Sequence, residues 1–417
     1  MTYLTMSEKI FSQKAGRTCR AGDFVICEPD LLMSHDGNRP LTIDILKDKK
    51  LPINFDTKRF VLVIDHHTPA PEDINANIHK WIREYSTLHD TILFENEGIC
   101  HQILPEKGLV LPGDLIIGTD SHTCTYGALN AFSTGVGTTD LAVALNQSKL
   151  WFRVPESIYI EINGTLPSNV YAKDLALFLC LTLGAHGATY MSLEFGGEGI
   201  QRLSMDSRLA ICNMAVEMGA KAGLMPYDYT LEAWLDQNIK STCYPIHPDS
   251  DAVYKKKITI NLDKLVPMVA KPHNVDYVVP ASELEDIPIH QANLAGCTNG
   301  RLEDLRVASS ILKGQKIYPG VKLLVVPASK KIMIDAMEEG ILQNIVEAGG
   351  VLAHPSCRGC SGGAKYGVPA NGDNVIASTN RNFCGRLGNP AASIYLASPA
   401  TVAASAVTGH ITDCQHI

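Results

Sequence analysis

Short apolar runs rich in β-branched residues alternate with helix-like stretches along this chain, and that alternation restricts its fold more than any other feature. The apolar runs span residues 59–67, 114–122, 157–164, 257–263 and 321–329. Helix-like segments lie between them, for example over residues 74–89 and 140–152. The pattern predicts an α/β fold with mostly parallel sheets, in which ligands bind beyond the carboxyl ends of the strands.

The length of the chain predicts more than one domain. Its 417 residues correspond to about three domains at roughly 150 residues each. We expect three α/β/α domains, formed by residues 1–155, 156–275 and 276–417.

Charge and composition exclude several classes of partner. The net charge of −8 disfavours a nonspecific nucleic-acid binder, which needs a large basic excess to neutralise phosphates. The first residues lack the apolar core of a secretory signal, and no apolar run is long enough to span a membrane. Twelve cysteines in such a chain indicate reduced thiols, some of them ligands, rather than a disulfide framework. We therefore expect a cytoplasmic protein without nucleic-acid or membrane partners.

Three of the cysteines lie in glycine-rich surroundings: Cys297 in GCTNG, and Cys357 and Cys360 in HPSCRGCSGG. Three thiolates can hold three corners of an iron–sulfur cube and leave the fourth iron open as a Lewis acid. Backbone N–H groups of glycine-rich loops suit such an anionic cluster. A zinc site with His354 as the fourth ligand is the alternative, and the residues alone leave both interpretations open.

Polar residues follow two of the predicted strands. Asp65 and His66 come after VLVI, and Asp120, Ser121 and His122 come after LIIGT. A carboxylate raises the pKa of a neighbouring imidazole and can orient it as a proton donor. Strand alternation would place Asp120 and His122 on one face and Ser121 on the other. A turn capped by Asp120 and Ser121 is the structural alternative.

The segment 205–223 is predicted to be a helix, because Asp206 or Ser207 can cap its start and Gly219 or Gly223 its end. Asn213 and Glu217 are four residues apart, so they would project from one helical face. They are either part of a site or ordinary solvated surface.

Two further segments contain candidate residues. His101 lies in GICHQILPEKG, which we expect to be a loop. Considered by itself, His101 could equally be a structural histidine. The segment STNRNFCGRLG contains Asn380, Arg381 and Arg386. Arginines in a short Asn- and Gly-rich segment suit bidentate capture of carboxylates, although a surface loop is the alternative.

The order of these segments along the chain closely resembles that of the aconitase superfamily. The succession is DHH, HQI, GTDSHT, CNMAVE, GCTNGRLEDLR, SCRGC and TNRNFCGR, and the match runs from about residue 20 to residue 414. Within the superfamily the chain is similar to the large subunits of 3-isopropylmalate dehydratase, homoaconitase and dimethylmaleate hydratase.

The resemblance implies a 4Fe-4S cluster held by Cys297, Cys357 and Cys360, with one open iron. It also implies that Asp65 and His66 form the pair whose imidazole protonates the departing hydroxyl. The reaction implied is the reversible dehydration and hydration of a hydroxy-dicarboxylic acid.

Roles for the other candidates follow from the same resemblance. His101 would pair with Asp120, and His122 with Glu217. The remaining residues would surround the cluster and the substrate: Ser121, Asn213 and Asn380 by hydrogen bonds, and Arg381 and Arg386 as carboxylate ligands.

Single-chain aconitases continue into a fourth, swivelling domain with a serine base and a carboxylate-binding arginine. The chain has no matching segment, so we expect a separate small subunit that carries them. The leading substrate pair is 2-isopropylmalate and 3-isopropylmalate in leucine biosynthesis, with homoaconitase or 2,3-dimethylmalate hydratase chemistry as alternatives. A non-catalytic regulatory protein with a cluster or zinc is the alternative of another class.

Overall fold

A computed structural model describes residues 3–38, 41–238, 243–361, 363 and 365–416 of the chain. It has a mixed α/β fold in which most strand pairs are parallel, as the sequence predicts. The antiparallel pairs among the described residues are β1–β7, β12–β13 and β12–β18.

The first sheet has the strand order β4-β3-β2-β5-β6, and all its pairs are parallel. Its strands are β2 (Leu31–His35), β3 (Phe60–Ile64), β4 (Ile92–Glu95), β5 (Leu115–Gly118) and β6 (Phe132–Gly135). Its helices are α2 (Leu41–Asp48), α3 (Asp73–His89), α4 (Cys100–Glu106) and α5 (Thr138–Gln147). All residues of β2, β3 and β5 are buried, as expected for apolar strands covered on both faces. Beside this sheet lie α1 (Met6–Ala15), β1 (Phe24–Cys27) and β7 (Leu150–Arg153).

The second sheet has the order β10-β9-β8-β11 and is parallel throughout. Its strands are β8 (Ser157–Asn163), β9 (Ser192–Gly196), β10 (Ala222–Leu224) and β11 (Lys256–Asn261). Its helices are α6 (Ala172–Leu183), α7 (Met205–Met214) and α8 (Tyr229–Asn238).

The third sheet has the order β13-β12-β18-β17-β14-β15-β16. Its strands are β12 (Met268–Ala270), β13 (Val278–Pro280), β14 (Gln291–Leu294), β15 (Lys322–Val325), β16 (Val351–Leu352), β17 (Asn374–Ala377) and β18 (Ser393–Leu396). Its helices are α9 (Leu302–Leu312), α10 (Lys330–Glu338), α11 (Ile341–Ala348) and α12 (Pro399–Thr408).

The three sheets are built from successive stretches of the chain, over residues 31–135, 157–261 and 268–396. β12 pairs within the third sheet although it precedes the expected boundary at residue 276. The division into domains at residues 155 and 275 stays a prediction.

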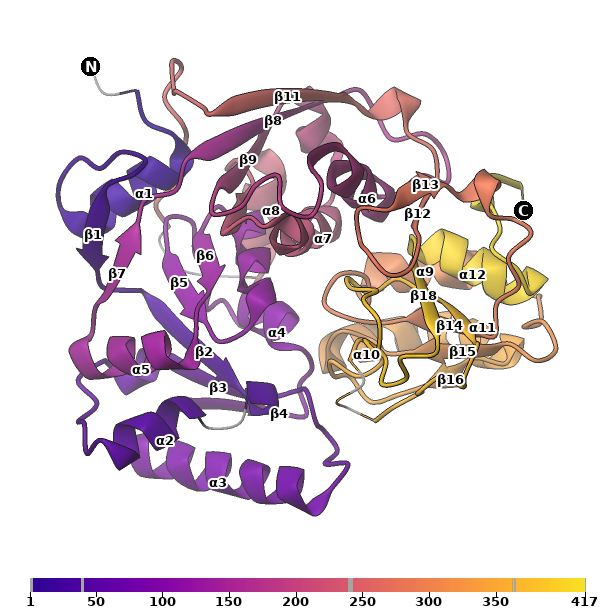
Figure 1. Cartoon of the computed structure of the whole chain (residues 1–417), viewed down its shortest axis with the longest axis horizontal. Coiled ribbons are helices and arrows are strands. Elements are labelled where there is room, and N and C mark those ends of the chain that lie inside the picture. Colours follow the sequence, from indigo (N-terminus) through magenta and orange to yellow (C-terminus); the bar gives the residue numbers. More distant parts are fainter. Residues whose placement is uncertain (1–2, 39–40, 239–242, 362, 364, 417) are drawn as a thin grey trace.

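One hydrophobic core continues through all three sheets and includes Val61, Ile160 and Val325. Figure 1 shows the third sheet and its helices, in orange to yellow, beside the first two sheets, in indigo to magenta. Between them lie α4 and α7; the segment before α4 is joined to the third part of the chain by a hydrogen bond from Ile99 N to Ala328 O (2.9 Å). The shared core therefore fixes the loops of the three parts relative to one another.

One sequence prediction fails at the end of the first part. Residues 140–152 were expected to be helical, but α5 ends at Gln147, and Leu150–Arg153 form β7. Ser148 adopts a left-handed conformation (φ 57°), which stops the helix, and the segment that follows pairs antiparallel with β1. Among the described helices, none combines the length and apolar character needed to cross a membrane.

Candidate functional site

Loops associated with the first and third sheets meet at one cavity of about 80 Å³. It is lined by His66, His101, Asp120, Ser121, His122, Cys297, Cys357, Cys360, Ser361, Asn380, Arg381 and Arg386. Most of these residues follow the carboxyl ends of β3, β5, β14, β16 and β17. The other three candidates, Asp65, Asn213 and Glu217, do not line the cavity but hydrogen-bond to residues that do.

Asp65 and His66 directly follow β3 and form a buried ion pair. The Nδ1 atom of His66 lies 2.7 Å from Oδ1 of Asp65, while Oδ2 of Asp65 accepts a hydrogen bond from the Cys100 N–H at 2.7 Å. Burial alone would lower the pKa of His66, but the carboxylates of Asp65 and Asp120 outweigh it and raise that pKa well above its usual value. His66 therefore holds a proton at neutral pH.

Two residues at the end of β2 support this pair and were missed in the sequence. His35 stacks on His66 with ring centroids 4.0 Å apart, and burial followed by the charge of His66 lowers the pKa of His35 to about 4. Asp36 accepts hydrogen bonds from the N–H groups of Asp65 (3.1 Å), His66 (2.9 Å) and His67 (2.8 Å). The signal was present, because HDG follows the apolar run LLMS in the same way as DHH follows VLVI.

The Asp36 carboxylate should be important for stability. In an Asp36→Asn variant, an NH₂ group replaces one carboxylate oxygen. That NH₂ group would face main-chain N–H donors and, on the Oδ2 side, also Nε2 of His79, which lies 3.0 Å from Oδ2 in the native chain. We expect the free energy of unfolding to fall by about 2–4 kcal/mol, since hydrogen bonds to a buried charge are lost. Urea denaturation of the variant measures the loss. The exposed Asp251 offers a control, and an equal change in Asp251→Asn and Asp36→Asn would contradict this prediction.

The Asp120 carboxylate lies among four histidines, His35, His66, His101 and His122. Its Oδ1 lies 2.9 Å from Nε2 of His101, and its Oδ2 lies 3.5 Å from Nε2 of His66. Burial would raise the pKa of Asp120, but His101, His122 and His66 hold it well below its usual value. Asp120 is therefore a carboxylate whose negative charge favours protonation of the imidazoles around it.

The arrangement of residues 120–122 differs from the alternation that the sequence predicted. β5 ends at Gly118, and residues 121–129 form a 3-10 helix whose N-cap is Asp120, which accepts from the His122 N–H at 2.7 Å. In such a turn successive side chains do not point to opposite faces. Asp120, Ser121 and His122 consequently all line the cavity.

His101 also differs from its predicted environment, because it lies in the first turn of α4 and not in a loop. The helix is short, over Cys100–Glu106, and includes Pro105 near its end. Within the described part of the chain, Nδ1 of His101 is buried without a hydrogen-bond partner, as is Nε of Arg386. Both atoms belong to residues that line the cavity, so a bound group can satisfy them.

Asn213 and Glu217 reach the site from α7 and the turn that follows it. Ser204, rather than Asp206 or Ser207, caps this helix. The helix runs from Met205 to Met214 and continues as a 3-10 turn over Ala215–Met218. Nδ2 of Asn213 donates to the sulfur of Cys297 at 3.0 Å, and Oε1 of Glu217 lies 2.8 Å from Nε2 of His122. Both side chains point toward the site, although the backbone changes from an α-helix to a 3-10 helix between them.

Two of the three cysteine sulfurs, those of Cys297 and Cys360, accept hydrogen bonds that suit anionic sulfur. Besides Asn213, Nδ2 of Asn380 lies 3.5 Å from the Cys297 sulfur, and Nη2 of Arg386 lies 3.3 Å from the Cys360 sulfur. A hydrogen bond from Cys357 and the charge of Arg386 lower the pKa of Cys360 well below its usual value in spite of burial. By contrast, burial raises the pKa of Cys297, and the hydrogen bond to Cys360 together with burial raises that of Cys357. The donors at Cys297 and Cys360 are of the kind that stabilises thiolates in metal clusters.

The three cysteine sulfurs do not form a compact group of the kind that holds a single metal ion. Among the described residues, the group of three or more potential ligands whose donor atoms all lie within 4.8 Å of one another is His35, Asp36, Asp65 and His66. The three cysteine sulfurs are not part of this group, whereas Zn–S bonds of about 2.3 Å bring zinc ligands within about 4 Å of one another. His354, the expected fourth zinc ligand, does not line the cavity.

Arg381 and Arg386 contribute positive charge on one side of the cavity. Nε of Arg381 donates to Oε1 of Glu217 at 2.7 Å, and its Nη2 donates to Oγ of Ser121 at 3.0 Å. Arg386 is bonded to the sulfur of Cys360. The guanidinium groups face the same space as the histidines, so an anion can bind between them.

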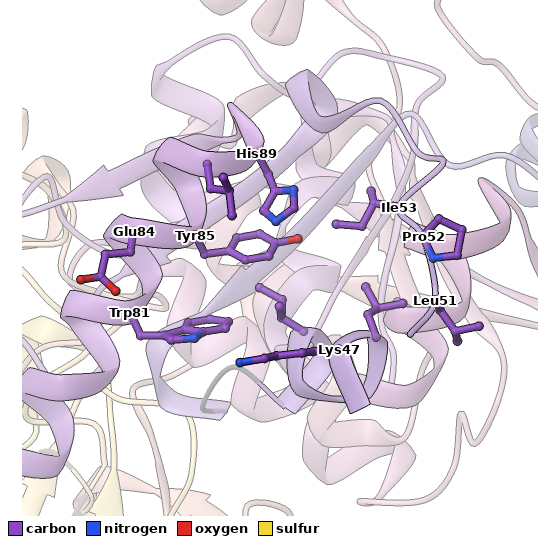
Figure 2. A pocket seen from close by; sticks show the side chains of 11 residues that line it. Lys47, Leu51, Pro52, Ile53, Trp81, Glu84, Tyr85 and His89 are labelled. Carbon is purple, nitrogen blue, oxygen red and sulfur yellow. The ribbon is translucent and has the colours of Figure 1, made fainter. Parts of the chain in front are cut away.

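A larger apolar groove of about 650 Å³ lies away from these residues, between α2 and α3. Figure 2 shows Trp81, Tyr85 and His89 along one wall, with Leu51, Pro52 and Ile53 opposite. None of the predicted site residues lines this groove. The polar cavity, and not the larger groove, is therefore the candidate site.

Comparison with known proteins identifies the family. The sequence model of the aconitase family (aconitate hydratase) matches residues 8–284 and 280–409. The chain belongs to the aconitase family. The family match covers the segments that carry all the candidate residues, from Asp65 to Arg386.

Curated members of the aconitase family resemble the chain over nearly its whole length. It is 44% identical to 3-isopropylmalate dehydratase large subunit 1 of Methanopyrus kandleri over 411 residues, which is 98% of each chain. It is 46% identical to 3-isopropylmalate dehydratase large subunit 1 of Thermotoga maritima over 418 residues, again 98% of each. It is 44% identical to a probable methanogen homoaconitase large subunit of Methanosarcina mazei over 395 residues, 94% of this chain and all of the relative.

Proposed function

We propose that the chain is the catalytic large subunit of a 4Fe-4S hydro-lyase that dehydrates and rehydrates a hydroxy-dicarboxylic acid. The observation that carries the proposal is the meeting of Cys297, Cys357 and Cys360 with histidine–carboxylate pairs and arginines around one cavity. The family match and the relatives' hydro-lyase names support the reaction class.

In this proposal the three cysteines hold the cluster, and Asn213, Asn380 and Arg386 donate hydrogen bonds to their sulfurs. When bound, the cluster supplies a Lewis acid that polarises the hydroxyl and a carboxylate of the substrate. The reaction involves no net transfer of electrons, so the chain's own residues have to move protons and balance charge.

His66 is the proton donor in the proposed mechanism. Its proton goes to the departing hydroxyl as the C–O bond breaks, and Asp65 orients the imidazole through Nδ1 and stabilises its charge. The proton lost from the neighbouring carbon goes to a base, which we place in a partner subunit. Arg381 and Arg386 bind substrate carboxylates, where negative charge accumulates as that proton leaves.

The proton donor predicts a pH dependence of the dehydration rate. Because the pKa of His66 is raised, the protonated acid is present through neutral pH, and kcat should fall as pH rises through this raised pKa. An Asp120→Asn variant removes one of the charges that raise the pKa, so the falling limb should move to lower pH. Profiles of kcat against pH for both proteins test this, and an unmoved limb in the variant would contradict it.

For the substrate we propose 2-isopropylmalate and 3-isopropylmalate, which would place the chain in leucine biosynthesis. The relatives named 3-isopropylmalate dehydratase support this choice. Homoaconitase chemistry is the second candidate, because the identity of the chain to a probable homoaconitase large subunit, 44%, equals its identity to two of these 3-isopropylmalate dehydratase large subunits. Hydration of dimethylmaleate is the third. One methylene in a pocket changes specificity by only about 1–3 kcal/mol, so small differences in the pocket decide among them.

We further propose a separate small subunit that carries the serine base and a carboxylate-binding arginine. The phrase "large subunit" in the relatives' names supports a partner of this kind. All twelve cysteines of the chain are free, which fits a reducing, cytoplasmic compartment.

A substrate panel tests the proposed activity. The chain is reconstituted anaerobically with iron and sulfide, combined with the small subunit from the same organism, and assayed with isopropylmalate, homocitrate and dimethylmalate. We expect turnover of one of these substrates and strict dependence on both subunits. A chain that holds its cluster and its partner but hydrates none of the corresponding unsaturated acids would refute the proposal.

A further inference from the structure

Among the residues that the structure describes, two completely buried cations have no carboxylate bound to their side chains. Lys173 and Arg301 are both 0% exposed. The third fully buried cation, Arg208, is bound by both oxygens of Asp228 at 2.8 and 2.7 Å. Among the ion pairs of the described residues, none includes Lys173 or Arg301. Burying a charge without a counter-ion is costly, so the position of these two side chains calls for a reason.

Lys173 extends from the first turn of α6 toward the loop after β17. Its Nζ donates to the carbonyl oxygens of Ser378 at 3.0 Å and Thr379 at 2.6 Å, and it lies 3.9 Å from the sulfur of Met214. Burial lowers the pKa of Lys173 to about 8. The two carbonyls immediately precede Asn380, so this ammonium fixes the loop that carries Asn380 and the two arginines of the site.

Arg301 fixes the loop of the first cysteine in the same way. Its Nη2 donates to the carbonyl of Cys297 and its Nη1 to the carbonyl of Thr298, each at 2.6 Å. Its Nε donates to Oε1 of Gln102 at 2.9 Å, which ties it to α4 next to His101. The nearby carboxyl of Asp304 accepts from the main-chain N–H of Arg301. Burial raises the pKa of that carboxyl to about 7, which makes Asp304 a weak counter-ion for the guanidinium.

A cubane cluster with three thiolate ligands adds negative charge to this region, whereas the cluster-free chain places unpaired positive charge there. We propose that Lys173 and Arg301 are positioning residues whose buried charges balance that of a bound anionic cluster and hold its ligand loops. The inference rests on the proposed cluster. It explains why both cations bind only neutral groups, since their counter-ion is the cluster.

The proposal predicts opposite effects in the two forms of the chain. The variant Lys173→Met removes the charge and keeps an apolar stem of similar length, while Lys173→Gln also keeps an amide donor. Lys173→Arg keeps the charge. Lys221→Met is the matched control, because Nζ of Lys221 donates to a single carbonyl, that of Gly135, at 3.4 Å. For each variant, three quantities are measured: the reduction potential of the cluster, its rate of loss to a chelator, and the urea midpoint of the cluster-free chain.

In Lys173→Met and Lys173→Gln we expect a more negative reduction potential, because a nearby positive charge favours the reduced cluster. We expect cluster loss to be about tenfold faster or more. The urea midpoint of the cluster-free chain should stay unchanged or rise. Lys173→Arg should restore the potential, and Lys221→Met should leave all three quantities as in the native chain.

The inference would be overturned if the reduction potential stayed unchanged in both charge-removing variants. It would also be overturned if these variants destabilised the cluster-free chain as strongly as the cluster-loaded chain. Where Lys173→Met does not fold, Lys173→Gln decides. If the proposed function itself is wrong, the native chain would bind no sulfide, so this outcome is distinguishable from failure of the inference about Lys173.

Discussion

Serine in place of Cys357 should remove iron and sulfide from the chain and abolish turnover. The expected effect is complete, because the remaining cysteines, Cys297 and Cys360, leave two corners of the cube without protein ligands. The change is nearly isosteric, and the site also contains an independent hydrogen bond from the Cys357 N–H to the carbonyl of Asp65 at 2.8 Å. The variant should therefore fold as the native chain does, with the same urea midpoint in the cluster-free state.

Iron and sulfide analysis after anaerobic reconstitution measures this effect, together with the visible absorption of the cluster. Cys384 is an exposed cysteine outside the cavity lining, so Cys384→Ser is the matched control and should retain full iron, sulfide and activity. Retention of a complete, active cluster in Cys357→Ser would exclude Cys357 as a ligand.

Asparagine in place of His66 should lower kcat by about 10²–10⁴-fold while the cluster stays in place. The imidazole is the proposed proton donor, and it is held between Asp65, Asp120 and the ring of His35. Asparagine can form a hydrogen bond but cannot deliver a proton at neutral pH. KM should change much less than kcat, because the carboxylate-binding arginines are untouched.

His67 provides the comparison for this variant. It follows His66 directly, yet it does not line the cavity. His67→Asn should therefore keep kcat within a few-fold of the native value. If His66→Asn and His67→Asn lose activity equally, the loop and not the imidazole of His66 is what matters. Steady-state kinetics of the reconstituted two-subunit enzyme distinguishes these outcomes.

The strand ends of the site could be predicted from the sequence, because an apolar run followed by polar residues indicates a ligand-binding edge of a parallel sheet. This reasoning found Asp65, His66 and residues 120–122. It was wrong about the side-chain directions in residues 120–122, since the chain leaves the strand at Gly118 and winds into a 3-10 helix. Alternation applies only while the backbone stays extended.

The supporting residues were harder to find, because their roles depend on contacts between distant parts of the chain. Asp36 follows an apolar run as the candidate residues do, but its hydrogen bonds to the main-chain N–H groups of Asp65 and His66 depend on the pairing of β2 with β3. Lys173 and Arg301 look like ordinary surface cations in the sequence, but the packing of α6 and α9 buries them completely. Resemblance to the aconitase family assigned roles to the residues of the site, and the structure adds the groups that hold those residues in place.

The measurement that tests the central claim most directly is the metal and sulfide content of the native chain after anaerobic reconstitution, combined with EPR spectroscopy of the reduced cluster with and without substrate. We predict iron and acid-labile sulfide in equal amounts, about four of each per chain, and a spectrum that changes when the substrate binds. One zinc ion per chain with no sulfide would contradict a site with one iron open to the substrate. A cluster whose EPR spectrum does not change when the substrate is added would contradict it as well.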